Sequence, residues 1–364
     1  MGQFDGRKRP PFSLQAETEQ DDWDPSRARS GYTGHIQALR DLARPHDPTL
    51  DHPASLAGAP LPAVSGGLSP AAQAILTRAR SADFLDVTYD LREPGFAEIY
   101  DTLLAPEWSV PFARLLLSVF LTLPRARGAQ LLDVGCGAGC PTLDLARFLG
   151  PDCDVAGIDV WDEAIALARR KAADEWLRNV SFLVADVTES GLPHATFDTL
   201  TCNLGLGSFA DRGAALGEMS RLLRPQGQLL LTTPLQSAMR EFLDTYYLTL
   251  RDLKLEHALH NLVQLINARP TVEMVRQMVE GAGLRVQRAV TDSFTLHYSD
   301  PKAFFSSLLV QTTYLESWRA ILPDLTIRRL VFNEVERRLR GRAESNGGQL
   351  VMSVPMLCIS ASRA

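Results

Sequence analysis

The apolar and polar positions in the middle of the chain follow two alternating patterns. Five short runs are rich in apolar and β-branched residues, at 130–134, 154–159, 180–185, 199–203 and 228–233. Amphipathic stretches with helical spacing lie between them, at 142–149, 162–175 and 214–223. Strands and helices that alternate at this spacing build βαβ units, and consecutive apolar positions suit strands covered on both faces. The pattern predicts an α/β fold with a doubly wound parallel sheet.

The pattern becomes helical after residue 235. Apolar residues between 239 and 250 recur at offsets of 3, 4, 7, 8 and 11 positions, which places them on one helix face. The remaining predicted elements are a helix from about 271 to 280 that ends in glycines, a sixth strand at 284–290, a helical block at 300–342 and a last strand at 350–360. We expect the helical blocks at 236–270 and 300–342 to be insertions over one edge of the sheet.

Residues 1–70 differ in composition from the rest of the chain. They hold 9 of the 22 prolines and 7 of the 25 glycines, with little apolar periodicity. Such a segment buries too little apolar surface to offset the entropy lost on ordering, so it is predicted to be a disordered tail. The predicted domains are this tail at 1–70, N-terminal helices at 71–128, a core at 129–298 with a helical cap insertion at 236–270, and a helical insertion with the final strand at 299–364.

Charge and composition narrow the class of partner. The 364 residues carry 37 Lys and Arg against 43 Asp and Glu, whereas nucleic-acid binding needs a basic footprint, so we expect no nucleic-acid partner. The longest apolar run, at 115–123, is too short to cross a bilayer. We therefore expect no membrane insertion and, without a secretory signal, a cytoplasmic location. The five cysteines form no C-x-x-C pair, which predicts reduced thiols and no metal site.

The end of the first predicted strand carries the clearest chemical signal. Residues 133–139 read DVGCGAG, after a strand and before a helix. Glycines at alternate positions allow a tight turn and the close approach of a ligand to the backbone, and the helix that follows offers unpaired N–H groups. Asp159 ends the next strand 20 positions after Gly139, where a carboxylate can accept both hydroxyls of a ribose. The spacing predicts a nucleoside ligand.

Asp133 decides which nucleoside fits this loop. A dinucleotide fingerprint needs a third glycine three positions after the second, and Cys140 stands there instead. A carboxylate at Asp133 would also repel a pyrophosphate by roughly 1–4 kcal/mol at about 4 Å, whereas it would attract an ammonium or a sulfonium. The loop is therefore predicted to bind a cationic nucleoside. S-adenosylmethionine supplies adenosine for Asp159 and an ammonium for Asp133.

The run from Asp133 to Gly139 resembles motif I of the class I S-adenosylmethionine-dependent methyltransferases. The resemblance continues through 157–159 (GID), 185–187 (ADV), 197–198 (FD) and 222–228 (LLRPQGQ), and it covers about residues 86–298. Within the class the sequence is most similar to small-molecule, methyltransferase type 11-like enzymes such as quinone C-methyltransferases and malonyl-carrier-protein carboxyl methyltransferases. The resemblance implies a Rossmann-like fold, S-adenosylmethionine as cofactor, and methyl transfer to an O or C atom of a small metabolite.

The resemblance also implies roles for individual residues around the methionine and ribose parts of the donor. Gly135, Gly137 and Gly139 would form the loop under the methionine part. Asp133 would face its ammonium, directly or through water. Asp159 would hold the ribose; from the residues alone, it could instead cap the helix that follows.

The adenine and the methyl group of the donor would meet a second set of residues. By the same resemblance, Val160 and Trp161 would pack on the adenine ring, although Trp161 fits ordinary core equally well. Asp186 would accept from the adenine amino group with the Val187 N–H on a ring nitrogen, unless Asp186 is simply a turn acid. Asn203 and Leu204 would line the methyl-donor channel. Tyr100 would close over the donor.

The sequence leaves the acceptor and any catalytic base open. In-line methyl transfer needs mainly alignment and exclusion of water. A phenol or a carbon acid would need a base as well, and the candidates are His194, His257, His260, His297, Tyr246 and Tyr247. The run NLGL at 203–206 differs from the N-P-P-aromatic run of enzymes that methylate base nitrogens, so we expect a small apolar or acidic metabolite. The alternatives are a NAD-dependent oxidoreductase and a non-catalytic adenosylmethionine-binding scaffold.

Two helical segments each have two interpretations. The apolar residues at 239–250 and 304–309 either roof an apolar substrate pocket or form ordinary core. The segment 327–342 holds six arginines against two glutamates and is either a solvated face or a dock for an acidic partner such as a carrier protein. The expected partner is therefore a small-molecule substrate, free or carrier-protein-bound.

Overall fold

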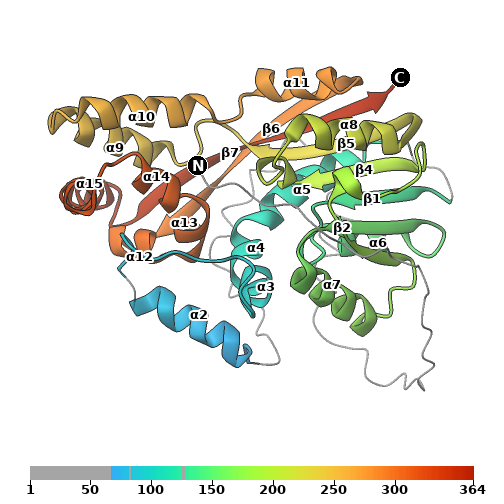
Figure 1. Cartoon of the computed structure of the whole chain (residues 1–364), viewed down its shortest axis with the longest axis horizontal. Helices are drawn as coiled ribbons and strands as arrows, with labels where there is room; N and C mark the ends of the chain where they lie inside the picture. The colour runs from blue at the N-terminus through green and yellow to red at the C-terminus, as the bar shows by residue number, and fades with distance from the viewer. Residues whose placement is uncertain (1–66, 82, 125–127) are drawn as a thin grey trace.

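The computed structural model of the chain describes residues 67–81, 83–124 and 128–364. Seven strands form one sheet in the order β3-β2-β1-β4-β5-β7-β6 (Figure 1). Their bounds are β1 Gln130–Val134, β2 Asp154–Asp159, β3 Val180–Val184, β4 Phe197–Asn203, β5 Leu223–Pro234, β6 Leu284–Tyr298 and β7 Leu350–Arg363. The strands from β1 to β5 pair in parallel, whereas β7 runs antiparallel to both β5 and β6. The predicted doubly wound, Rossmann-like α/β fold is confirmed.

Helices cover both faces of this sheet. The helices that follow the strands are α6 Thr142–Leu149, α7 Asp162–Asp174, α8 Arg212–Leu222 and α11 Val272–Gly281. Alternate residues along a strand point to opposite faces. Leu131 of β1 accordingly belongs to one apolar cluster with α6, and Leu132 belongs to another with α8 and α11. Both leucines are at most 2% exposed, which explains why the strands read as unbroken apolar runs.

The N-terminal helices begin beside the start of the helix 162–174, and the last of them, residues 109–120, packs on one face of the sheet. They are α2 Pro70–Ser81, α3 Phe96–Ile99, a π-helical turn at Tyr100–Leu104, α4 Ala105–Glu107 and α5 Ser109–Phe120. The carboxylate of Glu163, in the first turn of α7, accepts the Gly95 N–H at 2.7 Å and so fixes the start of α3. Gly95 has a φ of +89°, and a Cβ there would lie 2.6 Å from the Ala72 nitrogen, so only glycine fits.

A helical lobe is built on the far ends of β6 and β7. It consists of α9 Arg240–Asp252, α10 Glu256–Asn267, α12 Pro301–Ser306, α13 Leu308–Thr313, α14 Leu315–Ala320 and α15 Leu325–Ser345, seen on the left of Figure 1. The sixth strand was predicted to end at Val290, but it continues to Tyr298, which pairs with Leu350 of β7. The two strands thus form a long ribbon that carries the lobe.

The interior of the helical lobe is a cluster of aromatic rings. Phe242 of α9 stacks on Trp318 of α14 with ring centroids 3.8 Å apart, and it also contacts Phe304 at 5.6 Å. Phe242, Phe304, Phe305 and Leu309 are all at most 2% exposed. These residues therefore pack against one another, which supports the interpretation of the two segments as core.

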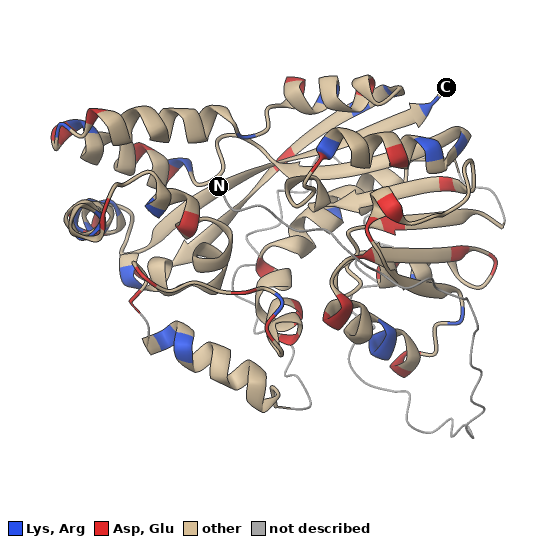
Figure 2. Ribbon diagram, viewed as in Figure 1, with Lys and Arg blue, Asp and Glu red and all other residues tan. Residues whose placement is uncertain are grey.

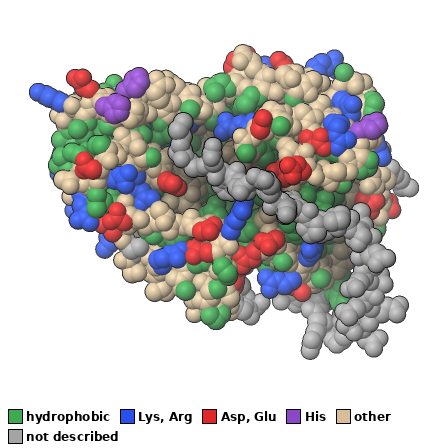
Figure 3. Space-filling view, viewed as in Figure 1, with side chains coloured by type: hydrophobic (Ala, Val, Ile, Leu, Met, Phe, Trp, Pro, Cys, Tyr) green, Lys and Arg blue, Asp and Glu red, His purple; other side chains and the backbone are tan. Residues whose placement is uncertain are grey.

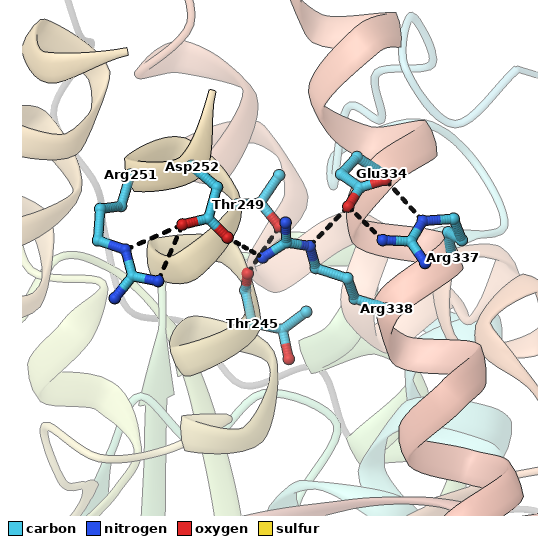
Figure 4. A network of polar contacts seen from close by, with 7 residues as sticks. All are labelled: Thr245, Thr249, Arg251, Asp252, Glu334, Arg337 and Arg338. Atoms are coloured by element: carbon cyan, nitrogen blue, oxygen red, sulfur yellow. Dashed lines mark hydrogen bonds and ion pairs between the residues drawn. The ribbon is translucent and has the colours of Figure 1, made fainter. Parts of the chain in front are cut away.

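Helix α15 contains the basic segment 327–342. Glu334 forms ion pairs with Arg337 and Arg338, and Arg338 reaches Asp252 of α9 at 2.9 Å (Figure 4). Arg340 pairs with Glu336 on the same helix. Acidic and basic side chains are likewise interspersed over the outer helices (Figures 2 and 3). Pairing of this kind favours the solvated-face interpretation of the segment.

Four expectations concern the tail, membrane insertion, metal binding and the state of the cysteines. Residues 1–66 of the predicted tail (1–70) lie outside the described residues. Within the described ranges no single helix is long and apolar enough to cross a bilayer; the bent pair Phe96–Glu107 and Ser109–Phe120 meets those criteria only when the two are counted together. No group of three or more His, Cys, Asp or Glu among these residues is arranged to hold a metal ion. All five cysteines are free thiols.

Candidate functional site

The glycine loop lies at the carboxyl end of β1, between that strand and α6. Gly135, Gly137 and Gly139 have φ values of +74°, +51° and +96°, in the left-handed region that favours glycine. A Cβ at Gly139 would lie 2.9 Å from the Leu143 side chain, so this glycine lets α6 pack closely. A Cβ at Gly137 would meet nothing within 4 Å. The backbone at Gly137 is therefore open to a ligand.

Asp159, at the end of β2, is hydrogen-bonded to the glycine loop. Its Oδ2 accepts the Gly137 N–H at 2.8 Å, and its Oδ1 accepts the Trp161 N–H at 2.9 Å. Burial raises the pKa of Asp159 above its usual value, while these two backbone donors lower it. Each oxygen keeps a second lone pair, so the bonds to the loop and to the start of α7 leave acceptor capacity for ribose hydroxyls. Asp159 thus holds Trp161, the residue before α7, but it does not cap that helix, and ligand binding stays open to it.

Asp133 lies in β1 directly before the loop and is only 1% exposed. Its Oδ2 accepts from the Thr142 hydroxyl at 2.5 Å, and its Oδ1 accepts from the Thr201 hydroxyl at 2.7 Å. Burial raises the pKa of Asp133 to about 6 against the stabilising effect of these bonds, which leaves the carboxylate mostly ionised at neutral pH. Because both oxygens already have partners, Asp133 offers a cationic ligand chiefly a buried negative charge beneath the loop.

Asn203 and Leu204 lie at the end of β4. The Asn203 amide donates to the Ser109 carbonyl at 3.1 Å and accepts from the Thr232 hydroxyl at 2.7 Å. Leu204 has a φ of +67°, and its N–H donates to the Thr232 carbonyl at 3.2 Å. Both residues therefore stand at the carboxyl edge of the sheet, where Asn203 joins the start of α5 to β4 and β5.

The threonines beside these residues were missed by the sequence reasoning. Thr201 is the direct register partner of Asp133 across β4 and β1, and Thr232 is the register partner of Asn203 across β5 and β4. The available signal was the alternation of polar Thr199, Thr201 and Asn203 with apolar Leu200 and Cys202. That signal identifies the partners only once the strand register is known.

Val160 and Trp161 follow Asp159 but lie in different environments. Val160 is 54% exposed, an open apolar surface beside the carboxylate. The Trp161 ring instead packs edge-on against Tyr100, with centroids 5.7 Å apart, and against Phe96 at 6.2 Å. Its indole Nε1 is buried and has no hydrogen-bond partner within the described residues. Trp161 thus holds the N-terminal helices, as the core interpretation expected, whereas Val160 remains available to a ligand ring.

Asp186 and Val187 lie just beyond the end of β3. Oδ1 of Asp186 accepts from both the N–H and the hydroxyl of Thr188, at 2.9 and 2.7 Å, which is the geometry of a turn acid. Asp186 is exposed, and Val187 is 4% exposed. The turn interpretation is therefore present in the structure, and the second carboxylate oxygen stays open for another donor.

Tyr100 lies close to this edge, while the candidate bases do not. Its hydroxyl lies 2.7 Å from the Ser109 Oγ, and burial raises its pKa. Tyr246 donates its hydroxyl to the Trp318 carbonyl inside the helical lobe. The remaining candidates are all exposed, namely His194, His257, His260, His297 and Tyr247. None of these six candidate bases, all within the described ranges, is hydrogen-bonded to residues 133–139, Asp159 or Asn203.

Comparisons with known proteins identify the family. Residues 126–283 match the family described as "Methyltransferase domain". The ubiquinone/menaquinone biosynthesis C-methyltransferase UbiE of Teredinibacter turnerae is 30% identical over 166 residues, which cover 43% of this chain and 67% of that protein. The chain belongs to the class I S-adenosylmethionine-dependent methyltransferases. Nocamycin O-methyltransferase of Saccharothrix syringae is 37% identical over 138 residues, covering 38% of this chain and 48% of that one.

The length of the match and a similar solved structure complete the comparison. The methyltransferase chain spans only about half to two thirds of the length of these curated relatives. Among solved structures, a SAM-dependent methyltransferase from Aquifex aeolicus is similar with a TM-score of 0.40 and 22% identity, covering 56% of this chain and 93% of that one.

The residues at the donor edge fit S-adenosylmethionine, the methyl donor of this class. Gly137 presents open backbone, and Asp159 keeps free lone pairs for hydroxyls beside it. Val160 presents apolar surface for a flat ring, and the charge of Asp133 complements a cation. A dinucleotide fits this edge poorly, because a buried, mostly ionised carboxylate beneath the loop disfavours a pyrophosphate.

Proposed function

We propose that this methyltransferase transfers a methyl group from S-adenosylmethionine to an O or C atom of a small metabolite. The observation that carries the proposal is the pair of hydrogen bonds by which Asp159 joins Gly137 to the start of α7. That arrangement sets a carboxylate with free lone pairs beside an open glycine backbone, which supports a ribose-binding role for Asp159. The O- and C-methyltransferase names of the relatives support the same choice of acceptor atoms.

The residues of the chain act mainly by positioning. The donor, when bound, supplies a methyl group on a positively charged sulfur that leaves as a neutral thioether. Asp159 and the glycine loop hold the nucleoside, and the negative charge of Asp133 favours the cationic end of the ligand. The N-terminal helices, fixed by Glu163 and by the Asn203–Ser109 bond, cover this edge and exclude water. An acceptor that has already lost its proton to solvent carries its attacking pair on oxygen or carbon, so for such an acceptor alignment accounts for rate without a dedicated base.

The substrate in this proposal is a free small molecule. A small-molecule substrate agrees with the relatives, whereas a carrier-protein-bound substrate would need a free basic dock. The arginines on α15 that the structure describes are mostly engaged with neighbouring carboxylates and carbonyls. The cytoplasmic location and the absence of a nucleic-acid partner stay predictions from the sequence.

The proposal is tested by cofactor binding and by product formation. Isothermal calorimetry should show binding of S-adenosylmethionine and none of NAD. Incubation of protein and donor with a cell extract should then give a metabolite heavier by about 14 mass units, one CH2, by mass spectrometry. Binding of NAD alone would support an oxidoreductase. Donor binding with no methylated product from any extract would support a non-catalytic scaffold.

A further inference from the structure

Arg269, between α10 and α11, is a cation without a charged partner among the described residues. One guanidinium nitrogen, Nη1, donates to the Ala238 carbonyl at 2.8 Å. The group is half-buried, and loss of water lowers its pKa. In the part of the chain that the structure describes, no carboxylate comes within ion-pair distance of it. A desolvated guanidinium with four remaining N–H donors is well suited to an anionic oxygen ligand.

Tyr314 lies beside Arg269 and has an unused polar group. The guanidinium carbon is 5.7 Å from the centre of the Tyr314 ring. Tyr314 is only 8% exposed, and its hydroxyl is buried with no hydrogen-bond partner in the described ranges. Burial raises the pKa of Tyr314, so the hydroxyl stays protonated and can donate. A buried hydroxyl of this kind is costly unless a ligand completes it.

Aromatic rings surround this pair. The Trp108 ring meets Tyr314 edge-on with centroids 5.8 Å apart, and Trp318 stacks on the other side at 5.3 Å. Phe112 and Phe294 pack against Trp108 in turn. The polar groups of Arg269 and Tyr314 are therefore set in an apolar, aromatic environment, which suits a planar ligand with one charged end.

The cluster lies at the same edge of the sheet as the donor site. Trp108 directly precedes Ser109, whose carbonyl accepts from Asn203 at the end of β4. Arg269 precedes Pro270, whose carbonyl accepts the Gln236 N–H just beyond the end of β5. Because β4 and β5 are paired neighbours, both connections end at adjacent carboxyl ends. The cluster is thus connected to the carboxyl ends of β4 and β5 on the side of the helical lobe.

We propose that Arg269 and Tyr314 bind the anionic oxygen group of the methyl acceptor, a planar apolar acid such as an aromatic carboxylate or phenolate. This inference rests on the proposed function, because it places the acceptor next to the donor. Arg269 supplies the charge, the Tyr314 hydroxyl donates a second hydrogen bond, and the Trp108 ring provides the apolar wall. The pair selects and orients the acceptor, and the acceptor atom that receives the methyl group is a separate part of the molecule.

A matched pair of probes tests this assignment. Binding of 2-naphthoate and of the neutral, similarly shaped 2-naphthamide is measured by calorimetry on the full chain, with S-adenosylhomocysteine present. The wild-type protein should bind the acid at least about tenfold more tightly than the amide, since charge-assisted hydrogen bonds are about twice as strong as neutral ones. Arg269→Gln, which can still donate to the Ala238 carbonyl, should remove this preference. Arg240→Gln is the control, because Arg240 forms an exposed pair with Asp244.

Tyr314→Phe provides a second variant that keeps the ring. It should weaken binding of 2-naphthoate several-fold, and its melting temperature should not fall, because the hydroxyl removed has no partner among the described residues. Undetectable binding of the acid to wild type, equal binding of acid and amide, or an unchanged preference in Arg269→Gln would overturn the proposal. Displacement of the donor by 2-naphthoate would overturn it too, because the acid would then occupy the donor site.

The outcomes separate this inference from the proposed function. A protein that binds S-adenosylmethionine but shows no preference for the acid contradicts the acceptor site alone. A protein that prefers the acid and loses that preference in Arg269→Gln, yet binds no donor, contradicts the proposed function.

Discussion

The donor edge and the helical lobe are stabilised by different kinds of contact. At the donor edge, meaning residues 133–139 with Asp159 and Asn203, backbone N–H groups and hydroxyls converge on carboxylate and amide oxygens. In the helical lobe, stacked rings such as Phe242 on Trp318 fill the interior. The hydroxyl of Tyr246 there is already bonded to a backbone carbonyl. The first region keeps acceptor capacity for a ligand, and the second uses its contacts within the fold.

This difference separates binding from stability. If the proposed function holds, loss of a side chain at the donor edge should remove ligand contacts but little buried apolar area. Loss of a ring in the lobe leaves a cavity and removes no group that touches the donor. Apart from the buried charge of Asp133, which affects both stability and binding, substitutions in the two regions should therefore change different measured quantities. Four substitutions test this in order of decreasing effect.

Phe242→Ala should have the largest effect, on stability. Removal of a fully buried ring costs about 3–5 kcal/mol through lost burial and a residual cavity. Urea unfolding should show this loss, while calorimetry on the folded protein should show unchanged donor affinity. Tyr247→Ala is the control, because Tyr247 lies on the same helix, α9, but is 39% exposed. Its stability should be nearly unchanged. A stable Phe242→Ala protein with weakened donor binding would contradict the separation.

Asp133→Asn should change how stability depends on pH. The folded-state pKa of Asp133 is raised to about 6 from 3.8, so the folded protein holds this proton to higher pH than the unfolded chain does. The carboxyl therefore costs no stability below pH 4, and its cost grows as the pH rises through 6, to about 3 kcal/mol at 1.36 kcal/mol per pKa unit. Urea unfolding at pH 4 and pH 8 should show a smaller fall for Asp133→Asn than for wild type.

The same residue predicts a pH effect on donor binding. A cationic ligand favours the ionised carboxylate, so donor affinity of the wild-type protein should fall as the pH is lowered from 7 to 5. The Asp133→Asn protein lacks this titrating charge, so its donor affinity, measured by calorimetry, should vary less over that range. Equal pH dependence in the two proteins would show that Asp133 does not sense the ligand charge.

Asp159→Ala should weaken binding of the donor without unfolding the protein. The buried hydrogen bonds that Asp159 would make to a ribose are worth roughly 1–3 kcal/mol, so calorimetry should show S-adenosylmethionine binding reduced accordingly. Asp154→Ala is the matched control at the opposite end of β2, where the side chain is exposed and accepts from Gln130. Unchanged donor affinity in Asp159→Ala would remove the basis of the proposed function.

Glu334→Gln should have the smallest effect. Its two arginine partners hold the pKa of Glu334 down at about 2, so the stabilisation exists above its ordinary pKa of 4.5 and disappears as the pH falls through 2. Surface ion pairs contribute little in water, and the melting temperature at pH 7 should fall by at most about 2 °C. Added salt should reduce even this difference. A drop comparable to that of Phe242→Ala would mean that the pairs in Figure 4 hold the lobe together.

The donor edge could be predicted from the sequence because its signals are local. Glycines 135, 137 and 139 and the carboxylate 20 positions later lie within one βαβ unit, so spacing alone brings them together. The partners of Asp133 and Asn203 depend on strand register, which no local pattern contains. Trp161 was ambiguous for a related reason, since its neighbours Phe96 and Tyr100 come from a helix more than 60 positions earlier.

The helical lobe was predicted less well. An apolar helix face looks the same whether it lines a pocket or meets another helix, so the segment 239–250 gave no means of choosing. The extension of β6 to Tyr298 was missed because residues 291–298 are mostly exposed and polar. Their strand conformation comes from backbone pairing with β7, between residues that are 52 to 66 positions apart in the chain.

The ribbon of β6 and β7 makes the two regions mechanically one body. Its pairing extends from Leu284 opposite Arg363 to Tyr298 opposite Leu350, with one irregularity in register between Val286 and Arg288. Movement of the lobe away from the sheet would bend or break this ladder of backbone hydrogen bonds. The ribbon therefore does not serve as a hinge. The helices α2 to α4 are attached through loops and side-chain bonds such as that of Glu163. We therefore expect α2 to α4, and not the lobe, to move when a ligand reaches the carboxyl edge of the sheet.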